Sequence, residues 1–126
     1  MSAAVQTFAA RGVSPSDLEV AIGPGARGCC YEIGAGLIPL FEGRFAGYQR
    51  SVGQPLESPL RQTAESIYVD NALLVRAELL SLGVPADRIA VFEGCTICDH
   101  RFFSFRREKE LSGRQVSVIG RAGKSK

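Results

Sequence analysis

The chain has 126 residues, with 15 basic and 13 acidic side chains and a formal net charge of +2. This length suits one domain that buries a core without needing disulfides or metal ions. The 45% hydrophobic and 22% charged fractions are ordinary for a globular protein and exclude a largely disordered chain. A net charge this small gives no reason to expect a nucleic-acid partner.

The composition also bears on location. No apolar run approaches the length of a membrane span, and residues 1–10 lack the basic start and continuous apolar core of a signal peptide. We therefore expect a cytoplasmic protein with no membrane partner, in which thiols stay reduced. Residues 1–120 are predicted to form a single domain, and residues 121–126 a basic flexible tail.

The first predicted elements come in two similar units. Val5 and Phe8 give residues 1–10 the apolar stripe of an amphipathic helix. Gly12 and Gly83 each end a helical stretch, and each is followed by a proline turn and a short β-branched strand that ends in glycine. The repetition is consistent with an internal duplication, and equally with two ordinary helix-to-strand connections.

The middle of the chain predicts two helices separated by a loop. Residues 35–45 read as a helix interrupted by Pro39, and residues 47–59 as a loop. Residues 65–82 read as a longer helix, capped by Thr63. Its apolar face consists of Tyr68, Val69, Ala72, Leu73, Val75, Leu79, Leu80 and Leu82. The alternation in residues 114–119 predicts a final strand with one buried face.

Cysteines provide the first candidate site. Cys95, Cys98 and His100 have metal-ligand spacing, and Cys29 with Cys30 would complete a tetrahedral set. A single CxxC motif is weak evidence, however, and adjacent cysteines on a strand point to opposite faces. We therefore expect packed, reduced thiols and no metal site in this chain, with structural zinc as the alternative.

His100 and the arginines provide the other candidates. His100 is the only histidine, and the acid nearest to it in sequence is the adjacent Asp99, so we expect an exposed side chain and no general base. Arg106 and Arg107, with Arg101 and Arg114 near them in sequence, are the best candidates for binding phosphate or another anionic substrate. If residues 106 and 107 lie on a strand, only one of them faces the site.

Several motifs in order resemble those of the bacterial laccase-domain family, also called polyphenol oxidases. They are residues 22–34 (IGPGARGCCYEIG), Asp70-Asn71, residues 95–108 (CTICDHRFFSFRRE) and residues 113–120 (GRQVSVIG). Arg27 stands where that family often has proline, and Phe105 where it has tyrosine. The resemblance covers nearly the whole chain and corresponds to the C-terminal half of the family. It implies an α+β fold, a mixed layered sandwich with helices outside β-sheets, present here in incomplete form.

The resemblance also implies a function. The family is described as purine nucleoside phosphorylases with adenosine deaminase activity, that is, as transferases and hydrolases that use zinc. Its metal ligands, two histidines and a cysteine, belong to upstream motifs that do not map onto this chain. We therefore expect no cofactor in this chain, no activity from it alone, and a partner in an N-terminal segment or in self-association. The alternative is a non-catalytic remnant or interaction domain of the same fold.

Overall fold

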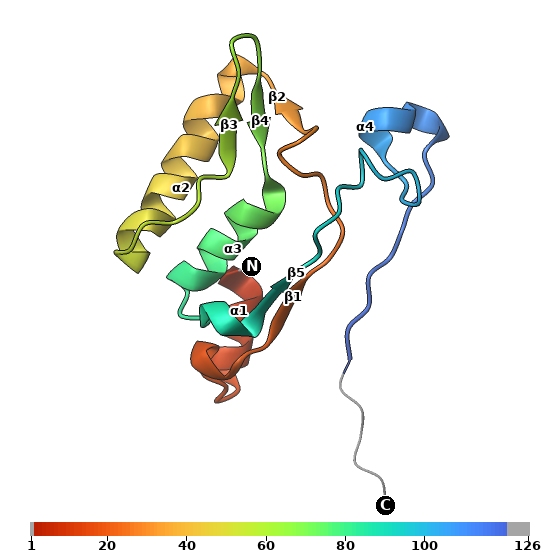
Figure 1. Ribbon diagram of the computed structural model, residues 1–126. Helices are drawn as coiled ribbons and strands as arrows, with labels where there is room; N and C mark the ends of the chain where they lie inside the picture. The colour runs from red at the N-terminus through yellow and green to blue at the C-terminus, as the bar shows by residue number, and fades with distance from the viewer. Residues whose placement is uncertain (1, 121–126) are drawn as a thin grey trace, which may run out of the picture.

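The computed structural model describes residues 2–120, and the predicted tail at 121–126 lies outside the described residues. The fold is α+β, as the resemblance implies, and the structure shows one parallel and one antiparallel sheet (Figure 1). The main elements in chain order are α1 (Ser2–Ala10), β1 (Val20–Ile22), β2 (Glu32–Ile33), α2 (Ile38–Val52), β3 (Leu60–Gln62), β4 (Ile67–Val69), α3 (Asn71–Ser81), β5 (Ile89–Val91) and α4 (Phe105–Glu108). Short 3-10 turns occupy Pro15–Asp17, Ala35–Leu37, Ala86–Arg88 and Lys109–Leu111.

The two similar units are confirmed, and they lie side by side. Each runs from a helix through a glycine and a 3-10 turn into a strand, and β1 pairs with β5 in parallel (Figure 1). Gly12 and Gly83 have φ angles of +83° and +98°, which only glycine adopts without strain. Val5, Leu79 and Val84 form the core beneath this sheet, each at most 6% exposed.

The antiparallel sheet has the order β2-β4-β3, and α2 packs against α3. The predicted helix at 65–82 is wrong in its first part, because residues 67–69 form β4 and pair on both sides. The helix begins at Asn71, where the side chain of Asp70 accepts a hydrogen bond from the Leu73 N–H. Thr63 instead closes the turn between β3 and β4 by bonding to Ser66.

Helix α2 is longer than the sequence predicts. Pro39 lies in its first turn, where a missing N–H costs nothing, so it starts the helix and does not interrupt it. The helix continues to Val52 and ends at Gly53, whose φ is +74°. The predicted loop at 47–59 is therefore confined to residues 53–59.

The C-terminal part differs most from the sequence prediction. Residues 105–108 form the short helix α4, so Arg106 and Arg107 do not lie on a strand. Residues 112–120 are extended but pair with no described strand, and they run away from α4 as a single length of chain (Figure 1). Val116, Val118 and Ile119 are 79% or more exposed, because no element of the described chain covers them. Within residues 2–120, no helix has the length and apolar character needed to cross a membrane.

Candidate functional site: a cluster of cysteines framed by arginines

Two loops meet at one edge of the parallel sheet. Residues 23–31 follow β1 and residues 94–101 follow β5, and the carboxyl ends of parallel neighbours lie at the same edge. The pairing extends beyond the strands through a bridge between Gly25 and Cys95, with the Thr96 N–H donating to Gly25 O at 3.0 Å. The segments that carry the cysteines are therefore brought together by the backbone.

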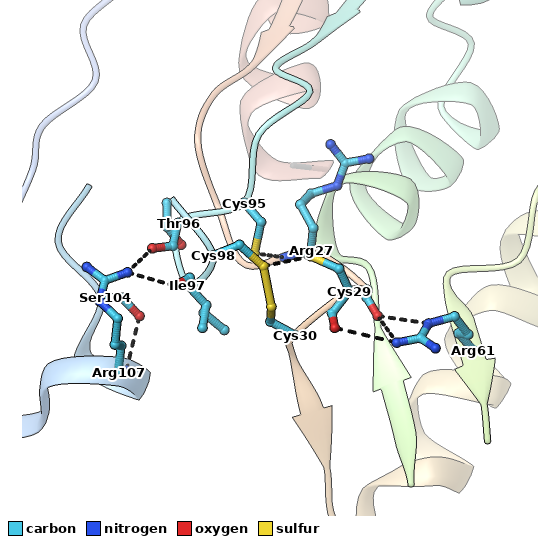
Figure 2. The surroundings of a disulfide bond; sticks show 11 residues. Arg27, Cys29, Cys30, Arg61, Cys95, Thr96, Ile97, Cys98, Ser104 and Arg107 are labelled. Atoms are coloured by element: carbon cyan, nitrogen blue, oxygen red, sulfur yellow. Dashed lines mark hydrogen bonds between the residues drawn. A yellow bond between two sulfur atoms is a disulfide. The ribbon is translucent and has the colours of Figure 1, made fainter. Parts of the chain in front are cut away.

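All four cysteines of the chain lie in this place. Cys29, Cys30, Cys95 and Cys98, here called the thiol cluster, have sulfur atoms within 4.8 Å of one another (Figure 2). The structure joins Cys30 to Cys98 by a disulfide and places the Cys29 sulfur 3.1 Å from that of Cys98. Cys95 is buried and Cys29 is exposed.

Two expectations from the sequence are wrong at this point. The chain was expected to hold four reduced thiols, but two of them are joined by the disulfide. Cys29 and Cys30 were expected to point apart, but they lie in a turn, where alternation between faces does not apply, and both sulfurs enter the cluster. The geometric argument against a four-cysteine metal site therefore fails.

The two free thiols have different acidities. Although Cys29 is exposed, desolvation by the protein atoms around its sulfur raises the pKa of its thiol, and hydrogen bonding to Cys95 raises it further. Burial also opposes ionisation of Cys95, but backbone N–H groups of Cys98, Arg27 and Ile97 act on its sulfur and lower its pKa on balance. One of these donors, the Arg27 N–H, lies 3.3 Å from the sulfur. Cys95 is therefore the thiol that ionises more readily.

Arg27 fixes the first loop, a role that its position in the sequence does not predict. Its Nε donates to Asp70 Oδ1 at 2.7 Å and its NH1 to Phe92 O at 2.9 Å. The Asp70 carboxylate also caps α3. Gly28 packs so tightly here that an added Cβ would lie 3.3 Å from the Cβ of Asp70. The Asp70-Asn71 motif is thus a support for the loop as well as a helix start.

A second arginine supports the same loop from β3. Arg61 donates from Nε and NH2 to Gly28 O at 3.1 and 3.0 Å, and its NH2 reaches Cys29 O at 3.5 Å (Figure 2). Its guanidinium carbon lies 4.3 Å from the ring centroid of Tyr68. These contacts hold the backbone beside the thiol cluster. Nothing in the spacing of the sequence pairs Arg61 with Gly28.

Arg107, one of the two predicted substrate-binding residues, holds the second loop. Its NH1 donates to Thr96 O and Ile97 O at 2.8 and 2.7 Å (Figure 2). Its NH2 donates to Phe102 O at 2.6 Å and to Glu108 Oε1 at 2.7 Å. The side chain is 18% exposed. Its donors are therefore engaged by the protein itself.

Arg106, the other predicted residue, is exposed and differently placed. Its guanidinium carbon lies 4.7 Å from the ring centroid of Tyr31, in the loop that carries Cys29 and Cys30. No hydrogen bond or ion pair of its guanidinium is found among residues 2–120. Its donors are thus exposed and not engaged by the described residues.

His100 lies outside the cluster, as an exposed residue. Its neighbours Asp99 and Arg101 form an ion pair with a shortest distance of 2.6 Å. Hydrogen bonds from Arg101 hold the pKa of the Asp99 carboxyl at about 2. Asp99 is therefore paired with Arg101 and does not orient the imidazole of His100, as a general base would require.

Comparison with known proteins places the chain in a family. The family model described as "Multi-copper polyphenol oxidoreductase laccase" matches residues 1–122. The chain belongs to this laccase-domain family. Its own residues do not fit a multi-copper centre, because such centres need several imidazoles and His100 is the only one in the chain.

Individual relatives carry names of purine-nucleoside enzymes. The chain is 39% identical over 113 residues to the purine nucleoside phosphorylase YlmD of Geobacillus stearothermophilus, covering 86% of this chain and 38% of that protein. It is 29% identical over 120 residues to the adenosine deaminase RL5 of an unknown prokaryotic organism, covering 94% of this chain and 44% of that protein.

Solved structures of the family agree with the fold. The crystal structure of YlmD from Geobacillus stearothermophilus matches with a TM-score of 0.65 and 34% identity, over 83% of this chain and 37% of that one. The hypothetical protein YfiH of Bacillus licheniformis matches with a TM-score of 0.64 and 25% identity, over 83% of this chain and 38% of that one. The laccase-domain chain thus spans about two fifths of the length of the relatives it matches.

Proposed function

We propose that this chain is the C-terminal part of a purine nucleoside phosphorylase of the laccase-domain family, with adenosine deamination as a related activity. The observation that carries the proposal is the 39% identity to YlmD over 86% of this chain, which corresponds to 38% of that enzyme. The segment would contribute substrate contacts, and the metal-bearing residues would come from a completing segment. We therefore expect this chain alone to be inactive.

The described parallel sheet supports the need for a completing segment. It has only two strands, β1 and β5, within residues 2–120. Parallel sheets are normally larger and covered on both faces. Exposed apolar side chains at Val116 and Val118 point to the same conclusion. A partner that adds strands and covers these side chains would remove both features.

Arg106 is the residue that we propose as the phosphate contact. Its guanidinium is exposed and its donors are not used by described residues, whereas those of Arg107 are engaged by carbonyl groups and Glu108. Guanidinium groups match the planar geometry of phosphate oxygens. Arg107 would act as a positioning residue that holds the loop beneath Arg106.

Activity in a completed enzyme tests the proposal. The N-terminal part of Geobacillus stearothermophilus YlmD fused to this chain should release hypoxanthine from inosine in the presence of phosphate, while this chain alone should not. In the fusion, Arg106→Ala should lower the phosphate-dependent rate about ten- to a hundredfold, equivalent to losing a charge-assisted contact of about 1.5–3 kcal/mol.

Arg106→Lys and Arg107→Ala are the controls. The lysine keeps the charge without the planar fork, so it should recover part of the phosphate dependence. Arg107→Ala should lower the melting temperature, and it should change the phosphate dependence of the rate less than Arg106→Ala does. Unchanged phosphate dependence in Arg106→Ala would refute the contact, and a fusion that folds but has no activity would favour a non-catalytic interaction domain.

A further inference from the structure

The thiol cluster has the composition and spacing of a metal site, and it contains none of the histidine ligands that the resemblance implies for the family. A tetrahedral zinc ion with Zn–S bonds of about 2.3 Å holds its sulfur ligands about 3.8 Å apart. The four sulfurs lie within 4.8 Å of one another, so small side-chain rotations suffice to reach that geometry. Sets of four thiolates select zinc or iron over magnesium or calcium.

Both loops are fixed by contacts that do not involve the sulfur atoms. The first is held by Arg27 bound to Asp70 and by Arg61 bound to Gly28 O. The second is held by Arg107 bound to Thr96 O and by the backbone bond from Thr96 to Gly25. Ligands carried on a preorganised frame lose little conformational entropy when they bind an ion.

The surroundings of Cys95 suit a metal-bound thiolate. The backbone N–H of Arg27, on the opposite loop, donates a hydrogen bond to its sulfur at 3.3 Å. Hydrogen bonds of this kind orient a ligand and balance its negative charge. Cys95 is buried, so this donor and the other three sulfurs are the polar surroundings of its sulfur.

We propose that the thiol cluster, in its reduced form, binds one structural Zn²⁺ ion that ties the loop after β1 to the loop after β5. Binding replaces four S–H bonds by four Zn–S bonds and releases four protons to solvent, with no change in oxidation state. The Cys30–Cys98 disulfide and the ion are mutually exclusive, because disulfide sulfurs are not thiolate ligands. Forming the site from that oxidised state takes two electrons and two protons, which an added thiol reductant supplies.

The site is structural because its ligand set is closed. Four thiolates fill a tetrahedral ion and leave no position for water or substrate, unlike catalytic zinc sites. It would hold the turn that carries Cys30 next to Tyr31, the residue on which Arg106 stacks. Zinc would therefore stabilise the platform beside Arg106 and would take no part in the chemistry.

Metal analysis of the full chain tests the proposal. Protein purified in a reductant and dialysed against zinc-free buffer should retain about one zinc per chain. Cobalt(II) should give the intense absorption of a tetrahedral tetrathiolate complex. Zinc should raise the melting temperature of the reduced chain, because an ion that binds only the folded state stabilises it.

Cys29→Ser is the decisive variant, because Cys29 is exposed and lies outside the disulfide. It should lose stoichiometric zinc and the tetrathiolate spectrum, yet still form the Cys30–Cys98 cross-link when oxidised. His100→Asn is the matched control and should retain zinc, which separates this site from one made by Cys95, Cys98 and His100.

Three results would overturn the proposal. They are a folded, reduced wild-type chain that retains no zinc, a Cys29→Ser variant that retains as much as the wild type, and iron in place of zinc. None of these measurements uses a nucleoside or phosphate. Failure here would therefore leave the proposed phosphorylase role standing, and failure of that role would leave the zinc site standing.

Discussion

Arg27 shows at the scale of one residue how this fold connects distant segments. Its side chain joins the loop after β1 to Asp70 at the start of α3 and to Phe92 O after β5. Both charged partners are about 15% exposed, so water screens the pair only partly. Arg27 thus connects three segments that are far apart in the sequence.

Loss of this pair should be measurable as stability. We expect Arg27→Ala to lower the free energy of unfolding by about 1.5–3 kcal/mol, the range for hydrogen bonds to charged groups. Asp70→Asn keeps a side-chain oxygen for the α3 cap but removes the charge, so it should cost less. Urea denaturation of both variants and of the double mutant measures the coupling. Strictly additive effects would show that the two side chains do not stabilise each other.

At the scale of elements, glycines decide where helices end. α2 ends at Gly53, and each of the two helix-to-strand units turns at a glycine of positive φ, Gly12 or Gly83. The sequence predicted the turns at Gly12 and Gly83 because glycine followed by proline is a strong local signal. It missed the start of α3 because the apolar residues of β4 continue the helical pattern, and only pairing with β2 and β3 makes them a strand.

Two glycine substitutions should act in opposite directions. Gly83→Ala forces a Cβ into φ +98° and should destabilise the protein by about 1–2 kcal/mol. Gly43→Ala lies inside α2, where an added Cβ meets no atom within 4 Å, and should stabilise by about 0.5–1 kcal/mol. Thermal unfolding of each variant gives the sign. If both substitutions changed stability in the same direction, backbone conformation would not explain the effect of alanine at these two positions.

At the scale of the whole molecule, the described chain leaves apolar surface uncovered. Val5, on the apolar stripe of the first helix, is not part of this surface, because it is 6% exposed and packs in the core against Leu79 and Val84. Phe8 is 48% exposed, and Val118 and Ile119 in the extended C-terminal segment are 89% and 79% exposed. Water does not favour apolar surface of this kind, and strand-like segments without partners pair readily.

We therefore expect the chain to self-associate at micromolar concentration when no completing segment is present. Light scattering after size-exclusion chromatography should give a mass above that of a monomer. Replacing Val118 and Ile119 by aspartate should shift the population toward monomer. Aspartate at Ala90, an exposed residue of β5, tests separately whether the chains associate through the edge of the parallel sheet. A clean wild-type monomer would argue against this prediction.

The sequence by itself determined what depends on neighbours in the chain: the two helix-glycine-proline-strand units, the amphipathic first helix, and the family through motifs in order. Only the tertiary structure decided the rest, because it depends on contacts between residues far apart. Cys30 and Cys98 are 68 positions apart, yet their loops meet because β1 and β5 pair in parallel. The role of Arg107 depends in the same way on the loop that surrounds it. Local pattern predicts which residues turn, and long-range pairing decides which side chains meet.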